Sequence, residues 1–236
     1  MEIQTLLLQA AQAAGVPLTE AQAGQFNTYA NLLEEWNRVM NLTAITGPEE
    51  TVHRHFIDSL LLCRAFALPA GASVIDVGTG AGFPGLPLKL YRPDIRLTLL
   101  DSLQKRLNFL EAVCTATGCE AKRIHARAED AGREPALRES YDVACARAVA
   151  ALPVLCEYCL PFVKTGGVFI AMKGPGLEEE LAAAQKALRV LGGKLESTHA
   201  FTLQDGSERR IAVIRKTKPT PPAYPRPAAK MKKQPL

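Results

Sequence analysis

A glycine-rich segment near residue 80 carries the residues best suited to chemistry. It reads Val74-Ile-Asp-Val-Gly78-Thr-Gly80-Ala-Gly82-Phe-Pro-Gly85 and begins with an apolar, strand-like run. Glycines in such a place let the backbone turn sharply and let a ligand approach the main chain. Asp101 ends the next apolar run, 23 residues after Gly78, where a carboxylate can bind both hydroxyls of a ribose. The pattern predicts a cofactor that contains a nucleoside.

Two cofactors fit a glycine turn followed by an acid: NAD and S-adenosylmethionine (SAM). Asp76 stands two residues before the first glycine, and a carboxylate there suits the ammonium and sulfonium of SAM better than a pyrophosphate. Phe83 and Pro84 occupy the place where the NAD pattern has its third glycine. A second register, from Gly80 to Gly85, restores the G-x-G-x-x-G spacing, but Pro84 interrupts its helix start. We therefore predict that the turn binds SAM. The alternatives are that it binds NAD in a nicotinamide-dependent oxidoreductase, or that it is a glycine-rich turn that binds no ligand.

Three later residues are expected in the same pocket. Ala128 and Glu129 follow the third predicted strand, where a loop would reach the adenine. Arg147 follows the fourth, at the carboxyl edge where ligands of such sheets bind, and can hold a carboxylate or phosphate with two hydrogen bonds. The alternatives are a solvated loop acid for Glu129 and a surface ion pair for Arg147.

The fourth strand also bears on which atom would be methylated. Enzymes that methylate exocyclic amines often carry Asn/Asp-Pro-Pro-Tyr there, whereas this chain has Cys145-Ala-Arg147-Ala-Val. Methylation of a base carbon needs a cysteine nucleophile, but the alternation of the strand predicts a buried Cys145. A ring nitrogen with a free lone pair needs neither device, and its methylation depends on positioning and electrostatics, for which Arg147 is the one catalytic candidate.

The elements that position these residues follow from hydrophobic periodicity. Residues 1–70 form a helical extension, with predicted helices over Met1–Ala14, from Thr19 with a capping box at Gln22, and from Pro48 to Phe66. Strands and helices then alternate over residues 71–217, which predicts an α/β domain with a mostly parallel sheet covered on both faces. The predicted strands are Ser73–Val77, Arg96–Leu100, Lys122–Ala126, Asp142–Ala146, Val168–Lys173, and a closing antiparallel pair, Lys194–Phe201 and Arg210–Arg215. The predicted helices are Leu86–Tyr91, Leu103–Thr117 with Ser102 as N-cap, Leu152–Pro161 and Leu177–Leu191.

Charge is distributed unevenly along the chain. The sequence has 28 Lys and Arg against 24 Asp and Glu, but residues 209–236 contain nine of the basic residues and no acid. The rest of the chain therefore has a net charge of −5, and the basic end suggests a polyanionic partner such as RNA. Residues 218–236 are rich in proline and are expected to run extended over the surface.

Composition excludes several classes of protein. With 47% apolar residues the chain is globular, and it has neither an apolar stretch that could span a membrane nor a convincing signal peptide. A soluble, cytoplasmic protein is therefore expected. Because such a compartment is reducing, the six cysteines are expected to be free thiols. Cys156 and Cys159 are expected in the core, because no second pair of ligands has the spacing of a zinc site relative to them.

Taken together, these motifs resemble those of the bacterial 16S rRNA guanine-N(7) methyltransferases, the RsmG or GidB family. The resemblance is carried by DVGTGAGFPGLPL and LLDSLQKRLNFL, and it continues in Trp36-Asn37, Asn41-Leu42-Thr43 and Arg54-His55-Phe-Ile-Asp58-Ser59. Downstream it includes Arg127-Ala-Glu129, Ala146-Arg147-Ala148 and Lys173-Gly174, so that it covers nearly the whole chain.

The resemblance implies a class I SAM-dependent methyltransferase fold, Rossmann-like with a mostly parallel seven-stranded sheet. It implies transfer of a methyl group from SAM to N7 of a guanine in 16S rRNA. We also expect a monomer that acts on 16S rRNA or the small ribosomal subunit, with no membrane and no metal. An RNA-binding factor with a vestigial pocket is the non-enzymatic alternative.

The resemblance also extends to individual residues. The family's cofactor positions correspond to Gly78, Phe83, Ala128, Glu129 and Arg147, to which the reasoning above adds Asp76, Gly80 and Asp101. Candidates for the substrate side of the cleft are Asn41, His55, Asp58 and Ser59, with helix packing or capping as the alternative. Hypothetical phosphate contacts are Arg38, His53, Arg54, Lys173 and the cations of the tail.

Overall fold

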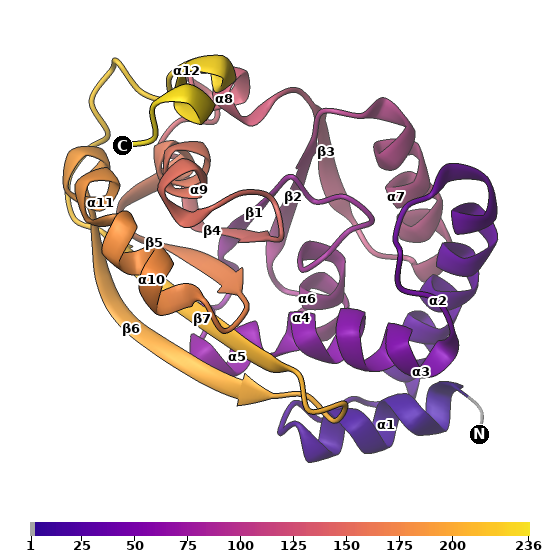
Figure 1. Cartoon of the computed structure of the whole chain (residues 1–236). Helices are drawn as coiled ribbons and strands as arrows, with labels where there is room; N and C mark the ends of the chain where they lie inside the picture. The colour runs from indigo at the N-terminus through magenta and orange to yellow at the C-terminus, as the bar shows by residue number, and fades with distance from the viewer. Residues whose placement is uncertain (1–2) are drawn as a thin grey trace.

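A seven-stranded sheet forms the centre of the molecule in the computed structural model, which describes residues 3–236 (Figure 1). The strands are β1 (Ser73–Val77), β2 (Arg96–Asp101), β3 (Ala121–His125), β4 (Tyr141–Arg147), β5 (Val163–Lys173), β6 (Gly193–Thr202) and β7 (Glu208–Lys216). Their order in the sheet is β3-β2-β1-β4-β5-β7-β6. Strands β1 to β5 are parallel, and β7 pairs antiparallel with β5 and β6, which confirms the predicted sheet and its antiparallel edge pair.

Helices from the first half of the chain cover one face of the sheet. They are α1 (Ile3–Ala13), α2 (Glu20–Met40), α3 (Pro48–Glu50), the π-helix η1 (Thr51–Ile57), α4 (Asp58–Leu60), α5 (Leu62–Ala65), α6 (Gly85–Tyr91) and α7 (Gln104–Thr117). Their apolar side chains pack with alternate strand residues, among them Val74, Val143 and Ile170. The first helix was expected from Met1, but Met1 and Glu2 lie outside the described residues.

Helices from the second half cover the other face. They are α8 (Ala128–Ala131), α9 (Leu152–Cys159), the 3-10 turn η2 (Leu160–Phe162), α10 (Leu177–Ala183), α11 (Gln185–Leu191) and α12 (Ala228–Lys233). They pack on the strand residues that point the opposite way, such as Ile75, Ala144 and Phe169. A sheet whose strands are apolar on both sides needs such a double cover, because each face must be removed from water.

Several helix boundaries differ from the sequence-based ones. Thr19 and Gln22 do form the predicted capping box. Ser102 is not the N-cap of α7, because the cap position falls on Leu103 and its N–H donates to Asp101 Oδ1 at 2.9 Å. The expected helix over 177–191 breaks at Ala184 into α10 and α11. Strand β5 begins at Val163, five residues early, because Val163 pairs with Tyr141 across a bulge.

The predicted helix over Pro48–Phe66 is not a regular α-helix. Its central residues, Thr51–Ile57, form a π-helix in which the Asp58 N–H points at the carbonyls of His53 and His55. The apolar period of this segment gives no sign of the wider turn. π-Helical turns are rare and often mark functional sites, so the segment is a place to look for function.

The C-terminal tail is docked on the second face rather than only extended. Residues 217–227 cross the surface without regular structure, as expected, but Ala228–Lys233 then form α12 and bury Met231 completely. The Arg226 guanidinium and main-chain N–H bind the buried Glu157 carboxylate at 2.7 Å. Lys216, also fully buried, donates to Thr220 Oγ1 and Leu160 O. The expectation that residues 218–236 run extended over the surface is therefore wrong for Ala228–Lys233, which form a helix with a buried Met231.

The cysteines behave as the sequence indicates. All six are free thiols, and Cys145, Cys156 and Cys159 are fully buried. Burial raises the pKa of the Cys145 thiol, which disfavours the nucleophilic thiolate. Among residues 3–236 no group of His, Cys, Asp and Glu side chains has the arrangement of a metal site, and no described helix is long and apolar enough to span a membrane.

Candidate functional site

Asp76 holds the glycine-rich turn from the inside. Its Oδ2 accepts hydrogen bonds from Thr79 Oγ1 at 2.7 Å and from the Gly85 N–H at 2.8 Å. A Cβ at Gly85 would lie 2.8 Å from that same oxygen and 2.8 Å from Leu99 Cδ2, so only glycine allows the helix start to approach the strand this closely. The carboxylate therefore shapes the turn, a role that the sequence-based argument from charge did not foresee.

The second oxygen of Asp76 is free for a ligand. Oδ1 is buried and has no hydrogen-bond partner among the described residues. Burial, only partly offset by the Thr79 and Gly85 hydrogen bonds, raises the pKa of Asp76 to about 6. A buried acceptor without a partner costs free energy, and a donor such as an ammonium group or a bridging water would remove that cost. This orphaned oxygen fits the amino group of a SAM-like cofactor.

Asp101 lies beside the turn, at the end of β2. Its Oδ2 accepts from the Gly80 N–H at 2.9 Å and from Arg106 Nη1 at 3.2 Å, and its Oδ1 accepts from the Leu103 N–H. An ionised carboxylate offers about four acceptor positions, so one remains for a hydroxyl group. Gly80 has a φ of +60°, and its missing side chain leaves open space next to the acid. The structure thus brings together the glycines and the acid, as predicted.

Arg147 connects the end of β4 to the π-helix. Its Nη1 donates to Asp58 Oδ2 at 2.9 Å and to Arg54 O at 3.1 Å, and its Nη2 donates to His55 Nδ1 at 3.1 Å. Its guanidinium also lies 4.9 Å from the centre of the Phe83 ring. Residues from three separate segments of the sequence therefore meet at one guanidinium.

His55 is neutral in this arrangement. Burial and the nearby Arg147 and Arg54 charges lower the pKa of His55 to about 3. Because arginine can only donate, Nδ1 must accept from Arg147, and Nε2 carries the proton. Nε2 then donates to Thr43 Oγ1 at 2.9 Å, and the ring stacks on Phe83 with centroids 4.2 Å apart.

A cavity of about 390 Å³ opens beside this cluster, lined by His55, Asp58, Arg147, Lys173 and Arg209, among others. Asp58 is paired on both sides, because its Oδ1 also accepts from Arg209 Nε at 3.1 Å. Lys173 pairs with Glu180 at 2.8 Å. The walls of the cavity are thus cationic, while its two carboxylates are neutralised.

The remaining predicted residues lie at varying distances from this cluster. Ser59 supports it indirectly, since its hydroxyl donates to His55 O. Asn41 is exposed and ends α2 with a φ of +49°, the capping alternative. Ala128 begins α8, with the buried Glu129 beside it. Two proposed phosphate contacts lie elsewhere.

Those two contacts are His53 and Arg38. The His53 side chain is buried and lines a separate cavity against α1 and the end of β6, where its Nε2 has no partner among the described residues. Its burial gives a phosphate no access. Arg38 is exposed on α2 and pairs with Glu34 at 2.8 Å.

Sequence analysis missed three residues of the site. Arg209 reaches Asp58 from β7, 151 residues away in the chain. The Tyr29 hydroxyl donates to Ala81 O in the glycine turn, and its ring stacks on Phe83, but in the sequence it is simply one of the apolar residues of α2. Thr79 is the only one with a usable local signal, because it stands inside the glycine motif.

Solved structures share the sheet and its helical layers. TrmN from Thermus thermophilus is similar with a TM-score of 0.52 and 19% identity over 70% of this chain and 53% of that one. TYW2 from M. jannaschii, solved in complex with AdoMet, is similar with a TM-score of 0.53 and 15% identity over 67% and 76%. With the glycine turn and Asp101 at the ends of neighbouring strands, the fold is that of the class I SAM-dependent methyltransferases.

Within that class the family is also defined. The model of the GidB family, rRNA small subunit methyltransferase G, matches residues 22–211. Curated relatives with the name ribosomal RNA small subunit methyltransferase G include those of Alkaliphilus oremlandii, 49% identical over 100% of both chains, and Desulforamulus reducens, 48% identical over 100% of this chain and 99% of the relative. This chain belongs to the GidB family, which leaves the nicotinamide-dependent alternative without support.

Proposed function

We propose that this protein transfers a methyl group from SAM to N7 of a guanine in 16S rRNA. The observation that carries the proposal is the absence of a free general base among the described residues that line the cavity. Asp58 and Glu180 are ion-paired, and the His55 Nδ1 lone pair is engaged by Arg147. Guanine N7 has a lone pair and no proton to lose, so it is an acceptor that such a site can serve by positioning alone.

The cofactor lies, in this proposal, over the glycine turn. SAM would supply a methyl group on a positively charged sulfur, and the neutral thioether S-adenosylhomocysteine would be the leaving group. Gly78 and Gly80 keep the main chain open, Asp101 binds the ribose, and Asp76 Oδ1 accepts from the amino group or a bridging water. The other proposed cofactor contacts are Phe83, Ala128, Glu129 and Arg147.

Arg147 and its neighbours position the acceptor rather than exchange protons with it. The Asp58 carboxylate, the Arg54 carbonyl and His55 fix the guanidinium, so it costs little reorganisation when the substrate binds. The cationic walls suit the phosphate and carbonyl oxygens of a nucleotide. Arg54, Lys173 and Arg209 are the proposed phosphate contacts at the cavity.

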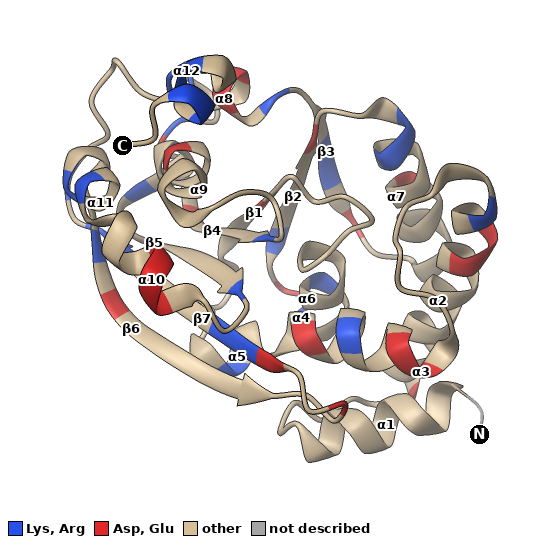
Figure 2. Cartoon of the chain, viewed as in Figure 1, with Lys and Arg blue, Asp and Glu red and all other residues tan. Residues whose placement is uncertain are grey.

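A second cationic surface lies on the docked tail. Lys230, Lys232 and Lys233 of α12 are exposed, and Figure 2 shows α12 as a largely basic helix. The helix is held on the second face of the sheet by the buried Met231, so its three lysines form one exposed cationic surface. We propose that they contact RNA phosphates, and that the protein works as a cytoplasmic monomer without a metal.

The test is methyl transfer from labelled SAM to small-subunit particles that lack the modification, followed by nucleoside mass spectrometry. We expect 7-methylguanosine as the product. A different methylated nucleoside, or no product despite tight binding of S-adenosylhomocysteine, would contradict the assignment of base or substrate. As a control, S-adenosylhomocysteine should inhibit the transfer and NADH should not bind.

A further inference from the structure

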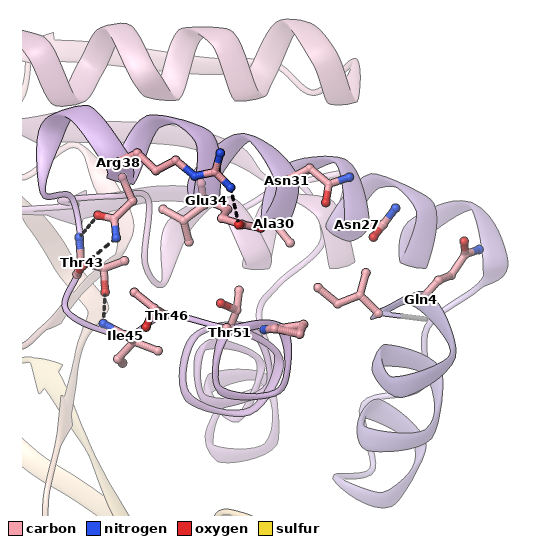
Figure 3. Close-up of a pocket in the computed structure, with 15 residues that line it drawn as sticks. Gln4, Asn27, Ala30, Asn31, Glu34, Arg38, Thr43, Ile45, Thr46 and Thr51 are labelled. Atoms are coloured by element: carbon pink, nitrogen blue, oxygen red, sulfur yellow. Dashed lines mark hydrogen bonds and ion pairs between the residues drawn. The ribbon is translucent and has the colours of Figure 1, made fainter. Parts of the chain in front are cut away.

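A second concave feature, outside the site, lies on the helical extension. A cavity of about 830 Å³ opens between α1, α2 and residues 43–51 (Figure 3). We call it the amide groove, because much of its lining consists of carboxamide and hydroxyl side chains. Those used in the argument are Gln4, Asn27, Asn31, Asn37, Thr46 and Thr51. Its volume lies within the range of about 300–1,000 Å³ typical of ligand pockets.

Two amides of the groove have no structural task. Asn27 and Asn31 lie one helical turn apart on α2, and neither side chain hydrogen-bonds to any residue within the described range 3–236. Asn37, about two turns further along α2, has by contrast a side-chain amide that is hydrogen-bonded within the protein. Its Nδ2 donates to Thr43 O at 3.0 Å, and its Oδ1 accepts from the Thr43 N–H at 2.9 Å. Figure 3 draws these bonds and shows Asn27 and Asn31 without any.

The amide groove adjoins the proposed acceptor cavity. Ile45 lines both, so the loop between α2 and α3 is a shared wall. The same loop is tied to the site by Thr43, whose Oγ1 accepts from His55 Nε2 at 2.9 Å and from the Ile45 N–H at 3.0 Å. A polymer whose one residue occupies the acceptor cavity can therefore place a neighbouring residue in the groove.

The lining matches a nucleobase. A carboxamide offers a donor and an acceptor side by side, which pair with the edge of a base, and unpaired bases are the ones that proteins read in RNA. Arg38 at one end is held only by an exposed pair with Glu34, a weak interaction that a phosphate can replace. We propose that the amide groove binds an unpaired nucleotide of the RNA substrate that flanks the target guanine. This inference rests on the proposed function.

The test compares the double variant Asn27→Ala/Asn31→Ala with the wild-type protein on small-subunit particles that lack the modification. We expect the KM for particles to rise about tenfold, in line with the loss of base contacts, while kcat stays within about twofold. Binding of S-adenosylhomocysteine should not change, because neither asparagine lies in the cofactor site. Asn108→Ala, an exposed asparagine on α7, is the matched control and should leave the KM unchanged.

A cross-linking experiment identifies the occupant directly. Asn31→p-benzoylphenylalanine, irradiated on the particles, should attach to 16S rRNA next to the methylated guanine. Attachment to a ribosomal protein would overturn the proposal, as would an unchanged KM in the double variant. Failure of the wild-type protein to form 7-methylguanosine would instead overturn the proposed function, so the two failures can be told apart.

Discussion

His55 takes its protonation state from its neighbours. Burial is the main reason that its pKa falls to about 3, and the Arg147 and Arg54 charges lower it further. Protonation would remove the acceptor for Arg147 Nη2 and place two cations in contact. The neutral ring is thus a condition for the geometry of the whole cluster.

This depressed pKa makes stability depend on pH. Below pH 6.5 the unfolded chain binds a proton at His55 that the folded protein does not bind until about pH 3, so stability falls as the pH drops through this window. Between pH 7 and pH 5 the loss from His55 is about 2 kcal/mol. Urea unfolding at both pH values should show a smaller loss in His55→Gln than in the wild type.

The control is His199→Gln, on β6 and outside the cluster, which should lose as much as the wild type. Asp76 acts in the opposite direction, because its raised pKa of about 6 means that stability increases as the pH falls through that value. It is present in all three proteins and cancels in the comparison. Equal losses in His55→Gln and the wild type would show that His55 does not titrate as described.

At the residue scale, the sequence predicts what lies at strand ends. Asp101 and Arg147 were found because they follow strands, and the carboxyl ends of parallel strands share an edge. The role of Arg209 could not be predicted from the sequence, because its pairing with Asp58 depends on the placement of β7 beside β5. Tyr29 was hidden by its apolar ring, since nothing in a helical period shows that its hydroxyl reaches Ala81.

At the scale of elements, the glycine turn and the start of α6 are one unit locked by Asp76. Gly85→Ala should therefore lower the free energy of unfolding by about 2 kcal/mol, because the new Cβ overlaps Asp76 and Leu99. The substitution should also weaken binding of S-adenosylhomocysteine. The new Cβ would displace the Asp76 carboxylate, which holds the glycine-rich turn through its hydrogen bond with Thr79. Chemical denaturation and isothermal titration measure the two effects.

Gly24→Ala is the matched control for that substitution. Gly24 lies within α2, and a Cβ there meets nothing within 4 Å. The change should stabilise the protein by about 0.5–1 kcal/mol, the helix cost of glycine, and leave cofactor binding unchanged. If Gly85→Ala behaved like Gly24→Ala, the interlock between Asp76 and the turn would not exist.

The π-helix shows what element prediction cannot supply. Pro48 and the apolar period correctly indicate a helix, but hydrogen-bond spacing within it is set by tertiary contacts. Here the carbonyls of Arg54 and His55 face Arg147, a residue some 90 positions away. A local pattern carries no information about such a partner, so His55 and Asp58 could be singled out from the sequence while the π-helical form of their segment could not.

At the scale of the whole molecule, the basic tail is an ordered part of the fold. Arg226 neutralises the buried Glu157, and Lys216 donates to Thr220 and Leu160. The charge asymmetry was evident in the sequence, but the pairing was not: five of these nine basic residues form ion pairs within the protein, namely Arg209, Arg210, Arg215, Lys216 and Arg226. The cations that remain exposed on α12 are Lys230, Lys232 and Lys233.

These three lysines should determine part of the salt dependence of RNA binding. Each phosphate contact that is lost lowers the slope of log K against log salt by about 0.7–0.9, so replacing all three with Gln should reduce it by about 2–3. The control replaces Lys186, Arg189 and Lys194 with Gln on α11 and β6, with the same change in net charge. Filter binding to 16S rRNA over a salt series measures both. If the slope of log K against log salt decreases equally in the two triple variants, the effect comes from net charge alone and α12 does not contact the RNA specifically. If the slope decreases only in the α12 variant, the lysines of α12 contact the phosphates.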